Sequence, residues 1–202
     1  DYRSIDKQYT HCEIEPSLIL SAVTLNIPFP EHLQAPRNVF LYWVGKEYSL
    51  ISMLRKIIYA YSNKGAGYNV HFITNDNLNQ YIPNVPDYFN DLQPSHQADY
   101  VRVNVICEYG GIWLDSDTLV LDTLDPLFEV VSKKDGFFIT QNNNILCNGV
   151  FGSKPQTPLM LEWKQNMIDI LQQNGSNISW TEIGNTLLED MYNDNSQWYA
   201  NY

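Results

Sequence analysis

The sequence predicts an α/β domain built on a mixed, mostly parallel sheet with helices on its flanks. Two observations lead to this class. Residues 38–74 read as strand, helix and strand, in the order that a parallel crossover unit requires. A second helix, ended by two glycines, leads directly into another short apolar strand and an Asp-Ser-Asp triplet. Because ligands in α/β folds bind at the carboxyl ends of such strands, the triplet marks the expected site.

The crossover unit begins with the β-rich run NVFLYWV at residues 38–44, which Gly45 ends. Apolar side chains then recur at helical spacing over residues 50–61. We expect Ser49 to be the N-cap of this helix, and Gly65 and Gly67 to end it. The run YNVHFIT at residues 68–74 is the second expected strand.

The second half of the chain continues the alternation. A helix is expected from an N-cap at Ser95 to Glu108, followed by the strand at residues 112–114 that carries the Asp-Ser-Asp triplet. Further strands are expected at residues 136–141 and 145–152. Helices are expected at about 159–173 and 181–192.

Composition narrows the classes of partner. The 202 residues include 12 Lys and Arg against 23 Asp and Glu, a net charge of -11, which is a poor match for nucleic acid or anionic lipid. No apolar run approaches the roughly 18 to 20 residues of a membrane span, so we expect no span in this chain. The cytoplasm is favoured over the secretory pathway, which would require that an N-terminal anchor had been removed. A small anion such as a sugar diphosphate can still bind, provided that a cation or local donors offset the acidity.

Asp115 and Asp117 form the candidate metal site. In extended backbone, side chains at i and i+2 project to the same face, so both carboxylates can approach one cation. Mg²⁺ or Mn²⁺ takes six oxygen ligands, which leaves positions for water and for two oxygens of a diphosphate. A cation there would neutralise a departing diphosphate. An Asp-x-Asp triplet alone is also common in solvated loops.

Asp99 and Arg102 lie at i and i+3 on the helix before the triplet, and thus on one helix face. Asp99 can accept hydrogen bonds from sugar or ribose hydroxyls. Arg102 can hold the transferred sugar or the diphosphate with its planar set of donors. The alternative is an ordinary surface ion pair, which would contribute little to stability.

The strings Ala98-Asp99-Tyr100-Val101-Arg102 and YGGIWLDSD, residues 109–117, resemble the family 32 glycosyltransferases. That family includes yeast-type mannosyltransferases, bacterial capsule enzymes and the glucosylating domains of clostridial toxins. Trp113 stands where the family hallmark has a second Tyr. The runs at residues 40–45, 123–127 and 148–153 resemble, in order, the first strand, the segment after the aspartates and a later strand of the family. The resemblance covers about residues 37–165.

The resemblance implies the fold of the nucleotide-diphospho-sugar transferases called GT-A, and a retaining transfer of a hexose. The donor would be a nucleotide diphosphate sugar, preferably a UDP-sugar, the cofactor Mn²⁺ or Mg²⁺, and the acceptor an unidentified glycan or protein. Asp115, Asp117 and Arg102 form the predicted catalytic set, with both aspartates on the metal. The predicted substrate-binding residues are Trp43, which would stack on the base, Asp99, Arg102, Trp113 and Asn148. Without the resemblance, Trp43 is as readily a core residue.

We expect one catalytic domain over residues 1–202. Residues 1–36, which carry four prolines, would form a wrapping arm, and residues 37–165 the donor- and metal-binding core. Residues 166–202 would form the C-terminal helices, and a truncation of the domain is expected to fall there. The segment at 181–185 resembles the family's C-terminal ligand turn only loosely.

Two other classes stay open. A haloacid dehalogenase-type phosphohydrolase also binds Mg²⁺ with an Asp-x-Asp after an apolar strand, but Leu119 stands where that class has Thr. A non-catalytic carbohydrate-binding module would fit the 13% aromatic content, which includes 14 tyrosines. A P-loop is absent from the sequence, and Gly65-Ala66-Gly67 precedes a strand instead of following one, so a dinucleotide fingerprint is excluded.

Overall fold

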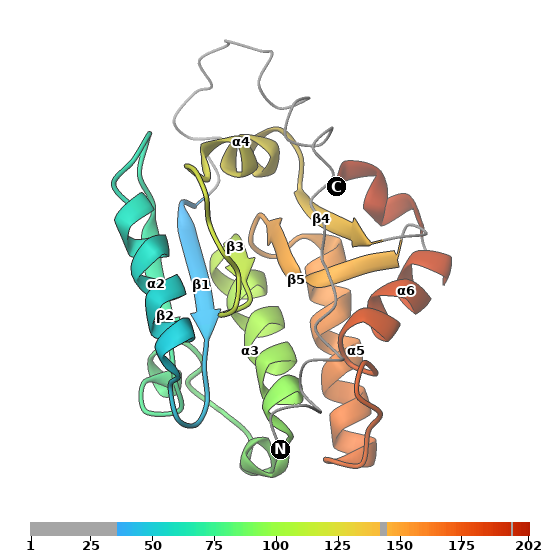
Figure 1. Cartoon of the computed structure of the whole chain (residues 1–202). Coiled ribbons are helices and arrows are strands. Elements are labelled where there is room, and N and C mark those ends of the chain that lie inside the picture. The colour runs from blue at the N-terminus through green and yellow to red at the C-terminus, as the bar shows by residue number, and fades with distance from the viewer. Residues whose placement is uncertain (1–35, 142–144, 195) are drawn as a thin grey trace.

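The computed structural model describes residues 36–141, 145–194 and 196–202. Within this part of the chain, five strands form one sheet in the order β2-β1-β3-β5-β4 (Figure 1). The strands are β1 (Asn38–Tyr42), β2 (Asn69–Ile73), β3 (Gly111–Leu114), β4 (Gly136–Gln141) and β5 (Ile145–Ser153). The α-helices are α2 (Ser49–Tyr61), α3 (Pro94–Tyr109), α4 (Asp125–Lys133), α5 (Pro158–Asn174) and α6 (Asn185–Asp194). Short 3₁₀ helices are η2 (Leu78–Gln80), η3 (Asp87–Asp91) and η5 (Ser196–Asn201).

The strand directions confirm the predicted sheet type. β1 pairs in parallel with both β2 and β3, as the strand-helix-strand pattern predicts. β5 pairs antiparallel with β3 and with β4, so β5 alone runs against the other four strands. The sheet is therefore mixed and mostly parallel by strand direction.

Alternation along the strands sorts the side chains into two apolar layers. Phe40 and Tyr42 of β1 pack with residues of α3, α5 and α6, whereas Val39 and Leu41 pack with residues of α2 and α4. Helices thus cover both faces of the sheet (Figure 1). Each fully buried Leu, Ile or Phe side chain contributes roughly 1.5–3 kcal/mol relative to an exposed one.

Helix α3 is buried on nearly every side, which is unusual for a helix with so many polar residues. His96, Gln97, Asp99, Arg102 and Asn104 are all buried. Buried polar groups require hydrogen-bond partners, and α3 obtains them from neighbouring elements. This helix consequently joins the apolar core to a polar site.

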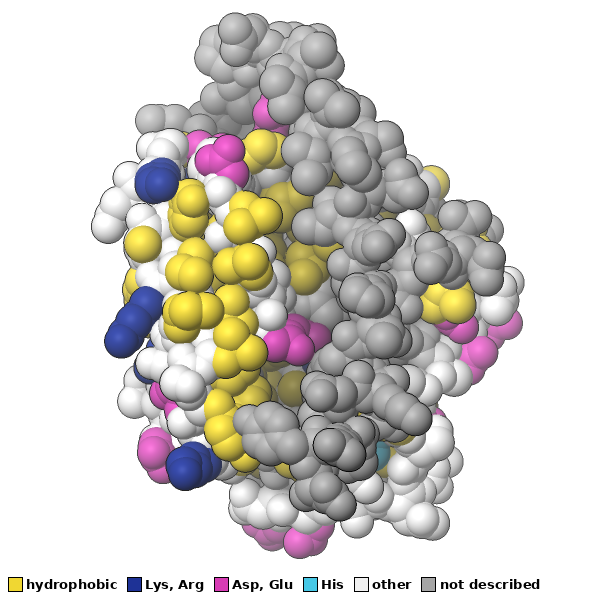
Figure 2. All heavy atoms as spheres, in the orientation of Figure 1, with side chains coloured by type: hydrophobic (Ala, Val, Ile, Leu, Met, Phe, Trp, Pro, Cys, Tyr) yellow, Lys and Arg dark blue, Asp and Glu magenta, His cyan; other side chains and the backbone are white. Residues whose placement is uncertain are grey.

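Helix α2 leaves part of its apolar surface open. Ile51, Leu54 and Ile58 face the core, but Leu50 and Met53 are 56% and 50% exposed. Figure 2 shows hydrophobic side chains gathered over α2 and the segment that follows β3. Leu50, the first apolar residue of the helical pattern, therefore does not belong to the buried side of α2.

The predicted N-caps are also wrong. α2 begins at Ser49 itself, after Tyr48, and α3 begins at Pro94, after Gln93, and neither preceding residue caps its helix with a side-chain hydrogen bond. The fixed φ of Pro94 suits the first turn of α3. α6 begins at Asn185, four residues later than expected, and the sequence pattern did not predict α4.

The expected N-terminal arm and the expected lack of a membrane span remain to be compared with the structure. The predicted wrapping arm, residues 1–36, lies outside them except for residue 36. None of the helices in the described ranges has the length and apolar character that crossing a membrane requires.

Candidate functional site

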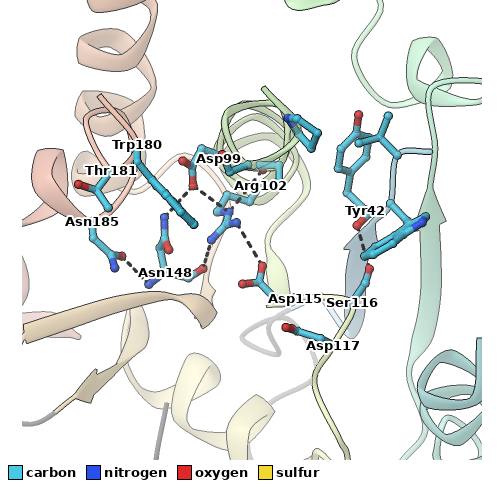
Figure 3. A pocket seen from close by; sticks show the side chains of 15 residues that line it. Tyr42, Asp99, Arg102, Asp115, Ser116, Asp117, Asn148, Trp180, Thr181 and Asn185 are labelled. Atoms are coloured by element: carbon cyan, nitrogen blue, oxygen red, sulfur yellow. Dashed lines mark hydrogen bonds and ion pairs between the residues drawn. The ribbon is translucent and has the colours of Figure 1, made fainter. Parts of the chain in front are cut away.

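Side chains from five parts of the fold gather around one open cavity of about 260 Å³. The cavity lies beyond the carboxyl ends of β1 and β3, where α/β folds bind ligands. Its wall is lined by Tyr42 at the end of β1 with Trp43 and Val44 after it, Pro94, Ser95, Ala98, Asp99 and Arg102 of α3, Asp115, Ser116 and Asp117 after β3, Asn148 of β5, and Trp180, Thr181 and Asn185 before and at the start of α6 (Figure 3).

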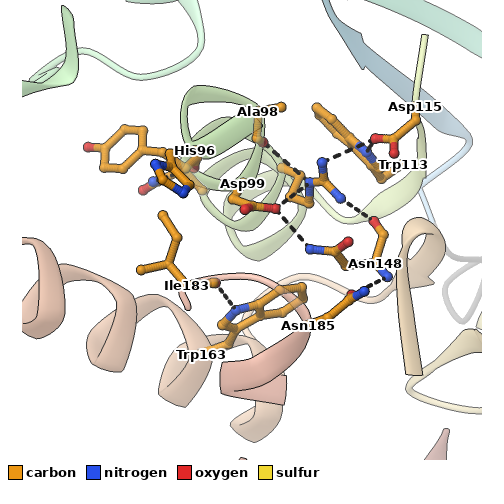
Figure 4. Close-up of polar contacts among 12 residues, drawn as sticks. His96, Ala98, Asp99, Trp113, Asp115, Asn148, Trp163, Ile183 and Asn185 are labelled. Carbon is orange, nitrogen blue, oxygen red and sulfur yellow. Dashed lines mark hydrogen bonds and ion pairs between the residues drawn. The ribbon is translucent and has the colours of Figure 1, made fainter. Parts of the chain in front are cut away.

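Arg102 is the centre of this site, and only 5% of it is exposed. Its Nη1 donates to the carbonyl oxygen of Asn148 at 2.7 Å. Its Nη2 lies 3.2 Å from Asp115 Oδ1, and its Nε lies 3.4 Å from Asp99 Oδ1. The guanidinium also lies over the Trp113 ring, 5.1 Å from the ring centroid. Arg102 thereby joins α3, β3 and β5 (Figure 3). Asn148 of β5 in turn lies between Asp99 and Asn185 and is hydrogen-bonded to both (Figure 4).

Asp99 is fully enclosed on α3. Burial raises the pKa of its carboxyl group to about 6, although Arg102 and the hydrogen bond from Asn148 favour the charged form. Asn148 Nδ2 donates to Asp99 Oδ1 at 2.9 Å. Gly184 packs against the same pair, since a Cβ there would lie 2.6 Å from Asn148 Nδ2 and 2.9 Å from both Asp99 carboxylate oxygens. The ion pair between Asp99 and Arg102 is therefore buried in the site and is not an ordinary surface pair.

Asp115 is held in place from two sides. Trp113 Nε1 donates to Asp115 Oδ1 at 2.8 Å, and Arg102 faces the same oxygen. The other oxygen, Oδ2, lies against Gly149, where an added Cβ would come within 2.8 Å of it. Only glycine at position 149 leaves room for the carboxylate in this orientation. Oδ2 has no protein donor among the described residues, so it is available to a ligand.

Asp117 is exposed at the mouth of the cavity. Loss of hydration beside the surrounding protein, and then the negative charge of Asp115, raise the pKa of Asp117. Between the two aspartates, Ser116 Oγ donates to the carbonyl oxygen of Tyr42 at 2.8 Å and ties the loop to β1. The two carboxylates are therefore electrostatically coupled on one short loop.

The donor set fits a hard divalent cation in part. The negative charge of Asp115 disfavours the charged form of Asp117, and a bound cation would offset that repulsion. Among the described residues there is no group of three His, Cys, Asp or Glu side chains that could hold a metal ion. The remaining ligands of a cation at Asp115 and Asp117 would have to come from water or substrate.

The predicted substrate-binding residues do not all reach the cavity. Trp43 is half-buried on the cavity wall, and its Nε1 donates to the carbonyl oxygen of Lys46 at 3.2 Å, so it is not a core residue. Trp113 is 1% exposed and does not line the cavity. The assignment of Trp113 to substrate contact needs correction, because the side chain packs in the core and positions Asp115 instead.

Sequence reasoning missed several residues on the cavity wall opposite Trp43. Trp180, Thr181 and Asn185 reach the cavity from the segment before α6, and Asn185 Oδ1 accepts a hydrogen bond from the backbone N–H of Asn148 at 2.9 Å. The loose resemblance of residues 181–185 to a ligand turn was the one signal for them. The sequence also offers Ser196, Gln197 and Trp198 as a closing loop, and the side chains of these three residues lie outside the described part of the chain.

A buried histidine fixes this wall. His96 of α3 is 1% exposed, and its Nε2 lies 3.1 Å and 3.2 Å from the carbonyl oxygens of Ser179 and Trp180. Trp163 Nε1 of α5 donates to the carbonyl oxygen of Ile183 at 3.0 Å. Of these carbonyl groups, only that of Ile183 lies within the helix expected from residue 181, and it accepts from a side chain of α5.

Comparisons with known proteins bear on the family and the fold of this chain. The family model described as capsular polysaccharide synthesis protein matches residues 3–196. An uncharacterized glycosyltransferase, L373 of Acanthamoeba polyphaga mimivirus, is 26% identical over 166 residues, covering 77% of this chain and 63% of that protein. The solved structure of the PaToxG glycosyltransferase superposes with a TM-score of 0.56 at 15% identity, over 92% of this chain and 78% of that one.

A shorter similarity points elsewhere. A stretch of 35 residues is 57% identical to DNA-directed RNA polymerase subunit 2 of the same mimivirus, which is 17% of this chain and 3% of that subunit. A match to so small a part of that subunit does not bear on the domain described above. The family match covers nearly the whole chain, so the chain belongs to the capsular polysaccharide synthesis protein family, with the fold of the GT-A glycosyltransferases.

Proposed function

We propose that this chain is a metal-dependent, retaining glycosyltransferase that moves a hexose from a nucleotide diphosphate sugar, preferably a UDP-sugar, to a glycan or protein acceptor. The observation that carries the proposal is the pair Asp115 and Asp117 at the mouth of a cavity whose inner wall is the buried Asp99-Arg102 pair. The family and the glycosyltransferase relative support the transferase class. The retaining outcome and the preference for UDP rest on the resemblance to family 32.

The metal would be Mn²⁺ or Mg²⁺, held by Asp115 Oδ2 and the Asp117 carboxylate. When bound, such a cation offsets the charge that develops on the departing diphosphate. Asp115 Oδ1 is already occupied by Trp113 and Arg102, so Oδ2 is the oxygen left for a cation. The acidity of the chain makes a cation necessary at this point, since a diphosphate beside two bare carboxylates would be repelled.

The protein's own residues would orient the donor. Trp43 offers an aromatic face on the β1 side of the cavity, where a nucleobase can stack for roughly 1–3 kcal/mol. Asp99, Asn148 and Asn185 lie on the opposite side and supply carboxylate and amide groups that suit sugar hydroxyls. Arg102 has most of its donors committed to protein partners, so we assign it chiefly to holding Asp99 and Asp115 in position.

Donor turnover tests the proposal. The chain is incubated with a panel of UDP- and GDP-hexoses and Mn²⁺, and the release of nucleoside diphosphate is measured. We expect Mn²⁺-dependent release from at least one donor, and a loss of more than about 100-fold in Asp115→Asn and in Asp117→Asn, because each removes one anionic metal ligand. Asp76→Asn, which changes an exposed carboxylate outside the cavity, is the matched control.

Two results would contradict the proposal. Turnover that needs no divalent cation, or that both aspartate variants retain, would remove the metal from the site. Release of phosphate from simple phosphomonoesters, without turnover of any nucleotide sugar, would favour the dehalogenase-type alternative.

A further inference from the structure

A second cavity of about 640 Å³ opens between the β4-β5 hairpin and α6. Phe138, Thr140, Ile145 and Leu146 of the hairpin form one side, and Glu189, Tyr192 and Asn193 of α6, with Tyr199 and Tyr202 beyond it, form the other. Figure 1 shows α6 lying beside the hairpin. The proposed donor site accounts for none of these residues.

Four aromatic residues line the cavity, and the hydroxyl groups of two of them, Tyr199 and Tyr202, are tied to the protein. Tyr199 donates its hydroxyl to the carbonyl oxygen of Leu188 at 2.9 Å. The Tyr202 hydroxyl bonds to Ser153 and Thr157 at 2.6 Å and 2.7 Å, and its ring stacks on Phe138 at 5.4 Å between centroids. These rings are therefore fixed as apolar platforms.

The rim supplies hydrogen-bonding groups of a particular kind. Glu189 and Asn193 lie at i and i+4 on α6, and thus on one helix face. Within the described part of the chain, neither side chain makes a hydrogen bond or ion pair to protein. Thr140 adds a hydroxyl, and among the described residues no Lys or Arg lines the cavity. A neutral ligand rich in hydroxyl groups suits this set better than an anion.

Helix α6 and strand β5 each carry residues that line both cavities, at successive positions along the element. On α6, Asn185 lines the donor cavity and Glu189 lines the second cavity, about 6 Å further along the helix axis. On β5, Asn148 lines the donor cavity and Leu146 the second one, about 7 Å away along the strand. A chain of sugar rings could pass from one cavity to the other along both elements.

From this arrangement we infer that the cavity between the β4-β5 hairpin and α6 binds the distal sugars of a neutral oligosaccharide acceptor, whose end enters the donor cavity. The flat C–H faces of sugar rings pack on the fixed aromatic rings, and Glu189 and Asn193 accept and donate hydrogen bonds to hydroxyls. The acceptor role rests on the proposed transferase function, whereas sugar binding in this cavity rests on its own residues.

Calorimetric titration without nucleotide or metal tests the inference. Neutral tri- to hexasaccharides of the malto-, cello-, manno-, galacto- and chito-series are added to the full chain. We expect at least one series to bind, and Tyr192→Ala and Glu189→Gln each to weaken its affinity by about five- to tenfold. Tyr59→Ala is the control, because Tyr59 is 44% exposed on α2 and Tyr192 is 47% exposed on α6. Circular dichroism confirms that each variant is folded.

The outcomes separate this inference from the proposed function. Oligosaccharide binding that depends on Tyr192 in a chain without donor turnover would retain the sugar site and reject the transferase. Donor turnover in a chain to which no oligosaccharide binds, or binding that survives both substitutions, would reject the second site alone. Concentration-dependent dimerisation that Tyr192→Ala abolishes would assign the cavity to a second copy of the chain and also overturn the inference.

Discussion

Replacement of Arg102 by glutamine tests the architecture of the site most deeply. The substitution removes a buried cation that faces Asp99 and Asp115, whose side chains are 8% and 35% exposed. Breaking a buried pair by deleting one partner typically costs about 3–5 kcal/mol, since a charge is left without compensation. Single domains are stable by about 5–15 kcal/mol, so the variant should fold with a marked loss of stability.

The pH dependence of this loss follows from Asp99. Its pKa in the folded chain is raised to about 6 from 3.8, so the folded state binds the proton more tightly than the unfolded state. Ionised Asp99 therefore costs stability as the pH rises from about 4 to 6, by roughly 3 kcal/mol in total. Without Arg102 the folded pKa moves higher still, so the cost of ionisation grows at neutral pH and disappears as Asp99 is protonated.

Urea unfolding monitored by tryptophan fluorescence between pH 5 and pH 8 measures the effect. We expect the gap in unfolding free energy between wild type and Arg102→Gln to be largest at pH 8 and to narrow towards pH 5. Arg55→Gln removes a partly exposed pair with Glu47 at 2.9 Å and should cost less than about 1 kcal/mol. A loss for Arg102→Gln that equals this control, or that is the same at all pH values, would refute the reasoning.

Three further outcomes are expected. Gly149→Ala places a Cβ 2.8 Å from Asp115 Oδ2, about 0.6 Å inside ordinary contact. It should lower Mn²⁺-dependent turnover roughly 10- to 100-fold while the unfolding midpoint in urea stays normal. Unchanged turnover would show that the position of this oxygen does not matter for turnover. Gly65 has φ +62, and a Cβ at this position would clash with the Asp125 carboxylate. Gly65→Ala should therefore lower the free energy of unfolding in urea by about 1–3 kcal/mol but leave turnover per folded molecule intact. An unchanged urea midpoint would contradict this close packing. Trp43→Ala should weaken UDP binding by about 5- to 100-fold in calorimetry, with Trp43→Phe less affected, and equal affinities would remove Trp43 from the nucleotide site.

Local sequence patterns predicted the parts of the fold that local forces determine. The run of apolar residues in β1 and the helical spacing of α2 were sufficient for the crossover unit, and Gly110 and Gly111 marked the end of α3. Geometry requires glycine at both positions. Gly110 has φ +62 and Gly111 has φ +122, and a side chain at Gly111 would also clash with the carbonyl oxygen of Asn38. That turn leads into β3, which places Asp115 at its carboxyl end, as predicted.

Long-range contacts explain what the sequence did not reveal. His96 and Trp163 hold the carbonyl groups of residues 179, 180 and 183, so α6 starts late and its preceding segment reaches the cavity. Trp113 lies within a motif that marks the site, but strand alternation turns its side chain into the core. Nothing in the local pattern announces that Gly184 will pack against Asp99, 85 positions earlier in the chain.

The pair of carboxylates is the part of the account on which the rest depends. Electron paramagnetic resonance of free Mn²⁺, titrated against the chain with and without UDP, measures binding at that pair directly. The account predicts that UDP strengthens Mn²⁺ binding to wild type, and that Asp115→Asn and Asp117→Asn each lose this strengthened binding. Equal Mn²⁺ binding by wild type and both variants in the presence of UDP would contradict it.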